Sequence, residues 1–304
     1  MPIRNQLPTG CFTPLVGPGE LWSYQGMKRS ERVITVKLCF AAALASFLAG
    51  CITNPETGRR QLLLVPESEM TQLGMNSFNQ MKQEVPISKD ARANELVQRV
   101  GKRIASVVNL PGAQWEFVVF ESKEANAFCL PGGKIGIYTG ILPLTKDDAG
   151  LAAVMGHEVA HATLQHGRER ISEGITTQVI GQGLGAAVNA ADPRWTGAFN
   201  QLYSPAAQLG VALPHSRTQE SEADWRGLIY MAKAGYDPEA SVAFWERFAA
   251  FNKQAGGTPW FLRTHPLDET RIQNLKQRMP EAKAQFKPSS SRRDESRVRS
   301  PKSN

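Results

Sequence analysis

The chain has 304 residues, which is enough for one substantial domain or two small ones. Its 41% hydrophobic and 21% charged residues are ordinary for a globular protein. The net charge of +7 lies at the ends, because residues 1–50 carry five Lys/Arg against two acids, residues 287–304 carry six against two, and 51–286 balances 24 against 24. A nucleic-acid-binding fold usually carries its basic patch on the folded domain, so we expect no nucleic-acid partner.

Residues 1–50 are predicted to be a secretory signal segment. Four basic residues precede the apolar run 38–49, which is too short to cross a bilayer as a permanent helix. The run ends in Leu-Ala-Gly-Cys51, which resembles the bacterial lipobox, where the cysteine is lipidated; an ordinary signal peptide with an incidental Cys51 is the alternative. Met27 directly precedes the basic residues and is expected to be the true start.

After cleavage at Cys51 only Cys129 would remain, so no intrachain disulfide is expected. The likeness to bacterial lipoproteins, with Ile52 after the cysteine, implies a lipid-anchored periplasmic protein at the inner face of the outer membrane. Residues 51–66 are rich in turn residues and are predicted to be a tether. Residues 67–286 are expected to form the folded domain, and 287–304, without apolar periodicity, a disordered basic tail.

Periodicity and helix-ending residues predict a mostly helical chain with two strands. One strand is expected over 115–120 and one over 134–138, after the turn at Pro131-Gly-Gly. The second strand precedes the motif helix described next, so we expect a sheet edge that holds peptide substrate, with a plain structural strand as the alternative. Apart from the motif helix, helices are expected over 67–83, 90–108, 216–236, 238–251 and 264–279.

The motif His157-Glu158-Val-Ala-His161 has the form H-E-x-x-H, in which both histidines share one face of a helix. Imidazole nitrogens are zinc ligands, and the adjacent Glu158 is placed to take a proton from a zinc-bound water. The motif alone is weakly specific, but it lies in an apolar segment that is predicted to be helical through Arg170. Thr145 to Asp148 resembles a capping box for this helix.

A catalytic zinc needs a third protein ligand. His166 lies about 140° around an ideal helix from His161, so we expect it to face away. Glu220 and Asp224 share a later helical face, so one can bind zinc while the other supports a ligand, and Glu222 should point outward. The glycine-punctuated segment 175–191, with the chain to about 214, is predicted to be mobile near the cleft.

H-E-V-A-H followed by E-S-E-A-D resembles the gluzincin zinc peptidases that include HtpX, BepA, LoiP and the CAAX prenyl proteases. The resemblance covers about 54–279 and includes Asn126-Ala-Phe, Pro131-Gly-Gly and Thr264-His265-Pro, with Arg271-Ile272. The absence of further domains favours the periplasmic lipoprotein branch. The resemblance implies an α+β, mostly helical, zincin-like domain with a small β-sheet beside the H-E-x-x-H helix.

Carried over by residue, the resemblance makes His157, His161 and Glu220 ligands of one Zn²⁺ per chain and Glu158 the catalytic base. Asp224 becomes the partner of a ligand histidine. His265 approaches the metal, where it stabilises an oxyanion or occupies the open position as a latch; a helix-entry histidine is the alternative.

The sequence therefore predicts a zinc endopeptidase, and the resemblance implies that its substrates are unfolded or misassembled envelope proteins. Two alternatives remain: a chaperone or assembly factor with a latched or weakly active zinc site, and another zinc hydrolase such as a cell-wall amidase.

Overall fold

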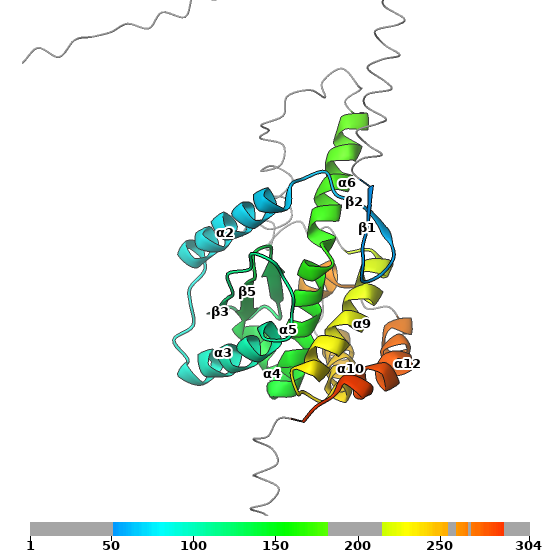
Figure 1. Ribbon diagram of the computed structural model, residues 1–304. Coiled ribbons are helices and arrows are strands. Elements are labelled where there is room, and N and C mark those ends of the chain that lie inside the picture. Colours follow the sequence, from blue (N-terminus) through cyan, green and yellow to red (C-terminus); the bar gives the residue numbers. More distant parts are fainter. Residues whose placement is uncertain (1–50, 182–214, 255–259, 267–268, 289–304) are drawn as a thin grey trace, which may run out of the picture. The chain divides into compact units, whose positions relative to one another are not determined.

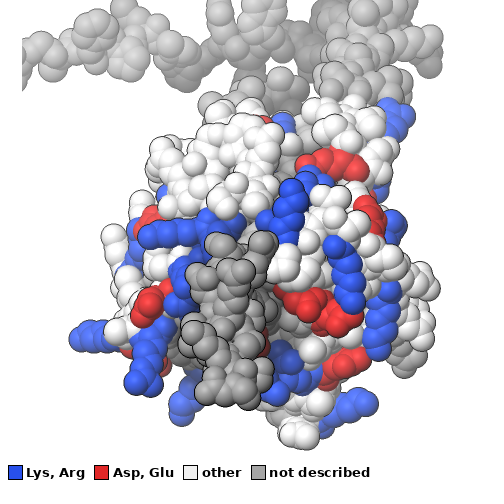
Figure 2. Space-filling model, turned by 60° about the horizontal axis from the view of Figure 1, so that its bottom comes forward, with Lys and Arg blue, Asp and Glu red and all other residues white. Residues whose placement is uncertain are grey.

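The computed structural model describes residues 51–181, 215–254, 260–266 and 269–288, and these are mostly helical with two small sheets (Figure 1). The predicted α+β, mostly helical class is confirmed. Basic and acidic side chains alternate over the face shown in Figure 2, as expected for a segment whose charges balance. Among the described helices, none combines the length and apolar character needed to cross a membrane.

The chain segment predicted to be a tether is part of the folded domain. Strands β1 (Cys51–Thr53) and β2 (Arg60–Leu62) form an antiparallel hairpin. The buried amides of Asn54 and Gln61 both donate to the carbonyl of Leu164, at 3.4 and 2.9 Å. The tether prediction over 51–66 is wrong because turn-rich composition does not reveal these long-range hydrogen bonds. The other domain bounds stay predictions.

The main sheet has three strands in the order β3-β5-β4. β3 (Glu116–Phe120) is parallel to β5 (Lys134–Tyr138), and β4 (Ala127–Leu130) is antiparallel to it. Both predicted strands are present, but β5 is central, so its prediction as a sheet edge is wrong. The reason is the turn between β4 and β5, where Gly132 and Gly133 have φ of 83° and 78° and close a hairpin that leaves β4 at the edge.

Helices α2 (Glu67–Glu84) and α3 (Ala91–Ala105) flank this sheet (Figure 1). The side chain of Asp90 caps α3 by accepting hydrogen bonds from the backbone N–H groups of Arg92 and Ala93. A short 3₁₀ turn, η2 (Thr139–Ile141), and α4 (Leu142–Thr145) then lead into the motif helix.

The motif helix α5 (Asp148–Thr163) runs through the centre of the domain, and every residue from Gly150 to His161 is buried. Asp147, rather than the predicted Thr145, is its N-cap and accepts from the N–H of Gly150 at 2.8 Å. The predicted continuation through Arg170 is wrong. Gln165 has a left-handed φ of 59°, which ends α5 and redirects the chain into α6 (His166–Gly181).

The C-terminal half supplies four more described helices. They are α9 (Arg217–Lys233), α10 (Glu239–Gln254), α11 (Trp260–Thr264) and α12 (Glu269–Gln285). Ser216 and Gln219 form a capping box at the start of α9. The predicted helix over 264–279 begins later, and His265 lies between α11 and α12. The predicted mobile segment falls mainly at 182–214, outside the described residues, while its first part continues α6.

Helices α5 and α9 cross at two glycines, Gly156 and Gly227. A Cβ atom on Gly156 would lie 2.9 Å from the Gly227 carbonyl oxygen, and one on Gly227 would lie 2.8 Å from the His157 backbone nitrogen. The backbones therefore approach more closely than any larger residue allows. This crossing brings the start of α9 to the motif histidines.

Replacing Gly227 by alanine is expected to lower the free energy of unfolding by about 1–3 kcal/mol, because the methyl group forces the helices apart. Urea unfolding of the purified protein measures this loss. Gly174→Ala is the control, since Gly174 is an exposed helical residue with open space around its Cβ position; it should be neutral or stabilising. Equal stabilities for the two variants would contradict the packing argument.

Candidate metal centre

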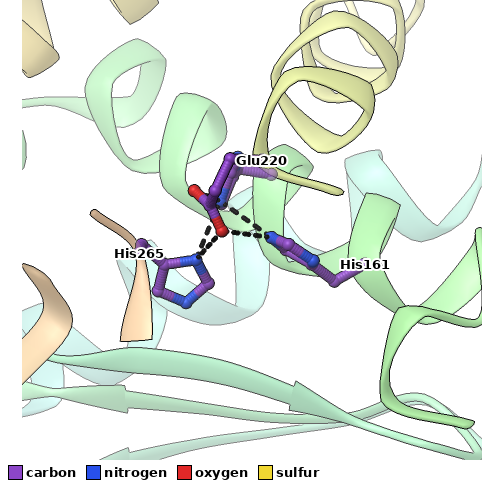
Figure 3. Close-up of side chains that lie close together, drawn as sticks. His161, Glu220 and His265 are labelled. Carbon is purple, nitrogen blue, oxygen red and sulfur yellow. Dashed lines mark hydrogen bonds and ion pairs between the residues drawn. The ribbon is translucent and has the colours of Figure 1, made fainter. Parts of the chain in front are cut away.

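Four buried side chains converge where α5, α9 and the α11–α12 connection meet: His157, His161, Glu220 and His265. Their nearest nitrogen and oxygen atoms all lie within 4.8 Å of one another. Figure 3 shows His161, Glu220 and His265 pointing toward one another. The structure thus brings together the three residues predicted as zinc ligands and the histidine predicted to approach the metal.

The spacing of these atoms fits a tetrahedral zinc. His157 Nε2 lies 3.1 Å from His161 Nε2 and 3.2 Å from His265 Nδ1. Glu220 Oε1 lies 3.3 Å from His161 Nε2 and 3.0 Å from His265 Nδ1. Ligands at the usual zinc–nitrogen distance are about 3.3 Å apart around a tetrahedron. The donor set of imidazoles and one carboxylate also suits this metal.

The electrostatics favour ligands that are ready to bind a cation. Burial lowers the pKa of both His157 and His161, so both rings are neutral and keep a lone pair. Burial by itself would raise the pKa of Glu220, but the charges of His265 and Arg271 outweigh it and hold that pKa well below its ordinary value. Glu220 is therefore a carboxylate.

Glu158 has a different environment from Glu220. Its carboxylate is buried and lies beside the ligand cluster, with Oε1 at 3.3 Å from His265 Nε2. Among the described residues, no group completes a hydrogen bond to this oxygen. Burial raises the pKa of Glu158 to about 7, which suits a group that takes and returns a proton near neutral pH.

Asp224 lies where the resemblance implies, as the partner of the first ligand histidine. Its Oδ1 is 3.0 Å from His157 Nδ1, the nitrogen that points away from the cluster. Arg271 donates to both oxygens of Asp224 at 2.7 Å and lies 2.9 Å from Glu220 Oε2. Its guanidinium also stacks on Trp245, 3.5 Å from the ring centroid. No role for Arg271 could be predicted from sequence spacing, because only the fold reveals these contacts.

The prediction that His166 faces away is wrong, because the chain turns at Gln165 rather than continuing as one helix. His166 is fully buried, and its Nδ1 lies 2.9 Å from His161 Nδ1. It is absent from the converging cluster, in agreement with its not being a metal ligand. Glu222 does not point outward either, since its Oε2 is 3.0 Å from His166 Nε2.

His215 also lies beside the cluster, and the sequence did not predict this position for it. Its ring lies 3.9 Å from that of His161 and 5.1 Å from that of His265, measured between centroids. Its backbone N–H donates to the Thr264 carbonyl at 2.9 Å, so it pairs with the segment that carries His265. No fixed spacing from the motif could have indicated this position.

A cavity opens beside Glu158 and His161. Its lining includes Asn126 and the first three residues of the edge strand β4, together with the start of α2. Apolar side chains contribute to this lining, among them Met70, Leu110 and Phe128. The cavity is thus bounded by the Glu158 carboxylate, members of the His/Glu cluster and an edge strand.

A mostly helical domain with a buried H-E-x-x-H helix, a distant glutamate ligand and a small sheet beside them is a zincin-like metallopeptidase domain. Residues 91–279 match the description "Peptidase family M48", and this match covers more than half of the chain. The chain belongs to this family of zinc metallopeptidases.

Curated relatives agree with this assignment. The chain is 38% identical over 186 residues to a mitochondrial metalloendopeptidase OMA1 of Schizosaccharomyces pombe, covering 61% of this chain and 53% of that protein. It is 32% identical over 256 residues to the OMA1 endopeptidase of Danio rerio, covering 81% and 53%. It is 30% identical over 198 residues to a putative beta-barrel assembly-enhancing protease of Vibrio cholerae, covering 64% and 40%. The chain thus spans about half the length of these relatives.

Two sequence-based predictions need correction or restriction. Mitochondrial endopeptidases of fungi, a plant and vertebrates are among the relatives, which contradicts the predicted lipid-anchored location in the periplasm at the outer membrane. Basic residues before a short apolar run are not specific for one compartment, which explains the error. The predicted membership of the peptidase family is confirmed, whereas the predicted assignment to the periplasmic lipoprotein branch of that family is not. Cys51 is exposed, and its lipidation stays a prediction.

The raised pKa of Glu158 predicts how the stability of the zinc-free protein depends on pH. Because this pKa is about 7 when folded and about 4.3 when unfolded, the unfolding free energy should fall as pH rises between these values, by up to about 3 kcal/mol. Urea unfolding in the presence of a chelator, from pH 4.5 to 7.5, measures the effect. In Glu158→Gln this pH-dependent contribution to the unfolding free energy should disappear. Parallel pH profiles of stability for the two proteins would contradict the raised pKa of Glu158.

Proposed function

We propose that this M48 peptidase is a zinc-dependent endopeptidase that cleaves extended segments of unfolded or misassembled proteins, and so acts in protein quality control. The observation that carries the proposal is the edge strand β4 beside Glu158. An edge strand lacks a neighbouring strand on one side, so a peptide can add to it there as a further strand next to the catalytic centre. Folded proteins present few such extended segments.

The apolar wall of the cavity supports the same substrate class. Met70, Leu110 and Phe128 can receive an apolar side chain, and unfolded proteins expose such side chains. The name of the Vibrio cholerae relative, a beta-barrel assembly-enhancing protease, also supports a link between this domain and protein assembly.

The chemistry follows from the side chains around the cluster. When bound, zinc supplies a Lewis acid that activates water and polarises the peptide carbonyl. Glu158 accepts the water proton and returns it to the leaving amine, which its pKa of about 7 permits in both directions. His157, His161 and Glu220 would hold the metal, and Asp224 with Arg271 keeps the ring of His157 in place.

His265 is proposed to act as a latch in the conformation described here. Its Nδ1 lies among the ligand atoms, 3.0 Å from Glu220 Oε1 and 3.2 Å from His157 Nε2, where water or substrate must enter. A catalytic zinc keeps one such position open. The oxyanion-stabilising role would require His265 to withdraw from this position first.

This placement also supports a second candidate function, that of a chaperone or assembly factor whose zinc site is permanently latched. Such a protein would need the residues that bind zinc but no general base for hydrolysis. The buried Glu158 beside the cluster favours the peptidase.

Glu158→Gln is expected to retain about one zinc per chain but to lose casein hydrolysis by at least about 100-fold, because the general base is removed. Elemental analysis and a fluorescent casein assay measure the two quantities. Glu246→Gln is the matched control, since Glu246 is an exposed helical carboxylate paired with Lys276. Full activity in Glu158→Gln would reject the mechanism, and equal cleavage of a folded protein and of casein would reject the preference for unfolded chains.

His265→Ala is expected to raise the initial rate of casein hydrolysis several-fold without reducing zinc content, because the position for water becomes free. Stopped assays with zinc-loaded wild type and variant give the comparison. A fall in kcat would instead support the oxyanion role. Activity absent from both proteins, with zinc bound, would support the chaperone.

A further inference from the structure

The two motif histidines are supported from behind in different ways. In His157, Nε2 points to the cluster and Nδ1 lies 3.0 Å from Asp224, which Arg271 holds through two hydrogen bonds. In His161, Nε2 also points to the cluster, but Nδ1 lies 2.9 Å from another imidazole, that of His166. The second motif histidine therefore reaches its carboxylate through an intervening ring.

That carboxylate belongs to Glu222, and it is firmly anchored. Glu222 Oε2 is 3.0 Å from His166 Nε2, and its two oxygens accept from Arg59 Nε and Nη2 at 2.8 and 3.1 Å. Arg59 also pairs with Glu169 on α6, at 2.7 Å between Nη2 and Oε2. Glu169 accepts further hydrogen bonds from Gln61 and Gln219. The N-terminal hairpin thus joins α6 to α9 behind His161.

The hydrogen-bonding capacities of these groups fix where each proton lies. A carboxylate paired with arginine only accepts, so His166 must donate to Glu222 through Nε2–H. A neutral imidazole carries one proton, so His166 Nδ1 is an acceptor. His161 must then donate through Nδ1–H, which leaves the lone pair of its Nε2 directed at the ligand cluster.

We propose that His166 is a positioning residue that, anchored by Glu222 and Arg59, holds His161 in the tautomer and orientation that bind zinc. The assignment extends the support of the metal to the hairpin of β1 and β2, far from the motif in sequence. It rests on zinc binding by the proposed peptidase. Loss of such a supporting group typically weakens metal affinity by about 10–100-fold.

A matched pair of variants separates hydrogen bonding from packing. His166→Leu removes the acceptor, whereas His166→Asn is smaller than histidine but places an amide oxygen close to the position of Nδ1. Zinc affinity of the full chain is measured by competition with a chelator. We expect affinity to fall about 10–100-fold in His166→Leu and only several-fold in His166→Asn, which keeps an acceptor for His161 but loses the contact with Glu222.

Ser172→Ala provides the stability control. Ser172 is also buried on α6 and accepts from the Leu64 N–H at 2.9 Å, but it does not contact the histidines. This variant should lower the melting temperature of the zinc-free protein without changing zinc affinity. Arg59 is the partly exposed residue that anchors Glu222. Arg59→Ala should weaken zinc binding several-fold, and it replaces His166→Leu as the test if that variant does not fold.

A spectroscopic readout tests the proton assignment itself. The chain has five histidines, so imidazole signals of protein labelled with ¹⁵N-histidine can be assigned. In the zinc-loaded wild type, His161 should show a slowly exchanging Nδ1–H proton, and this signal should be lost in His166→Leu.

Equal affinities for wild type, His166→Leu and Arg59→Ala would overturn this inference while leaving the peptidase intact. Equal weakening in the leucine and asparagine variants would also overturn it, since packing alone would then explain the effect. A wild-type protein that binds no zinc would overturn both this inference and the proposed function.

Discussion

The whole site depends on the close contact between α5 and α9. Because Gly156 and Gly227 carry no Cβ, the two helix backbones meet directly beside His157. That contact places the first two turns of α9 against the motif, so Glu220 and Asp224 reach the two nitrogens of His157 from the same helix. A wider separation would leave the motif histidines without the carboxylates of α9.

Burying so many polar groups is costly, and the structure offsets that cost by pairing them. Ionised groups in a protein interior are tolerated when they are paired and hydrogen-bonded. Arg271 satisfies Asp224 and lies against Glu220, while Arg59 satisfies Glu169 and Glu222. Two carboxylate oxygens of the site, Glu158 Oε1 and Glu220 Oε2, have no hydrogen-bond partner among the described residues. Glu220 Oε2 lies 2.9 Å from the permanently charged Arg271, whereas Glu158 Oε1 has only His265 nearby, at 3.3 Å.

Much of the cluster could be predicted from local sequence, because its members lie at helical spacings. The four-residue separations of His157 from His161 and of Glu220 from Asp224 put each pair on one helical face, and the structure agrees. His265 was indicated by resemblance. His166 was misjudged because the spacing argument assumes an unbroken helix, and a single left-handed residue, Gln165, invalidates it. Glu222 was misjudged because the outer face of α9 is covered by Arg59 and His166.

The sequence by itself determined the class of chemistry, since ligand types and their spacing along one helix are local properties. It also determined most helices and both expected strands, because hydrophobic periodicity and turn residues act over short distances. Only the tertiary structure decided that β4 rather than β5 is the edge beside Glu158, that residues 51–62 pack behind the motif, and that Arg271 and His215 join the site. The strand order depends on which of three strands pair. The other features depend on contacts between residues more than 40 positions apart, which no local pattern encodes.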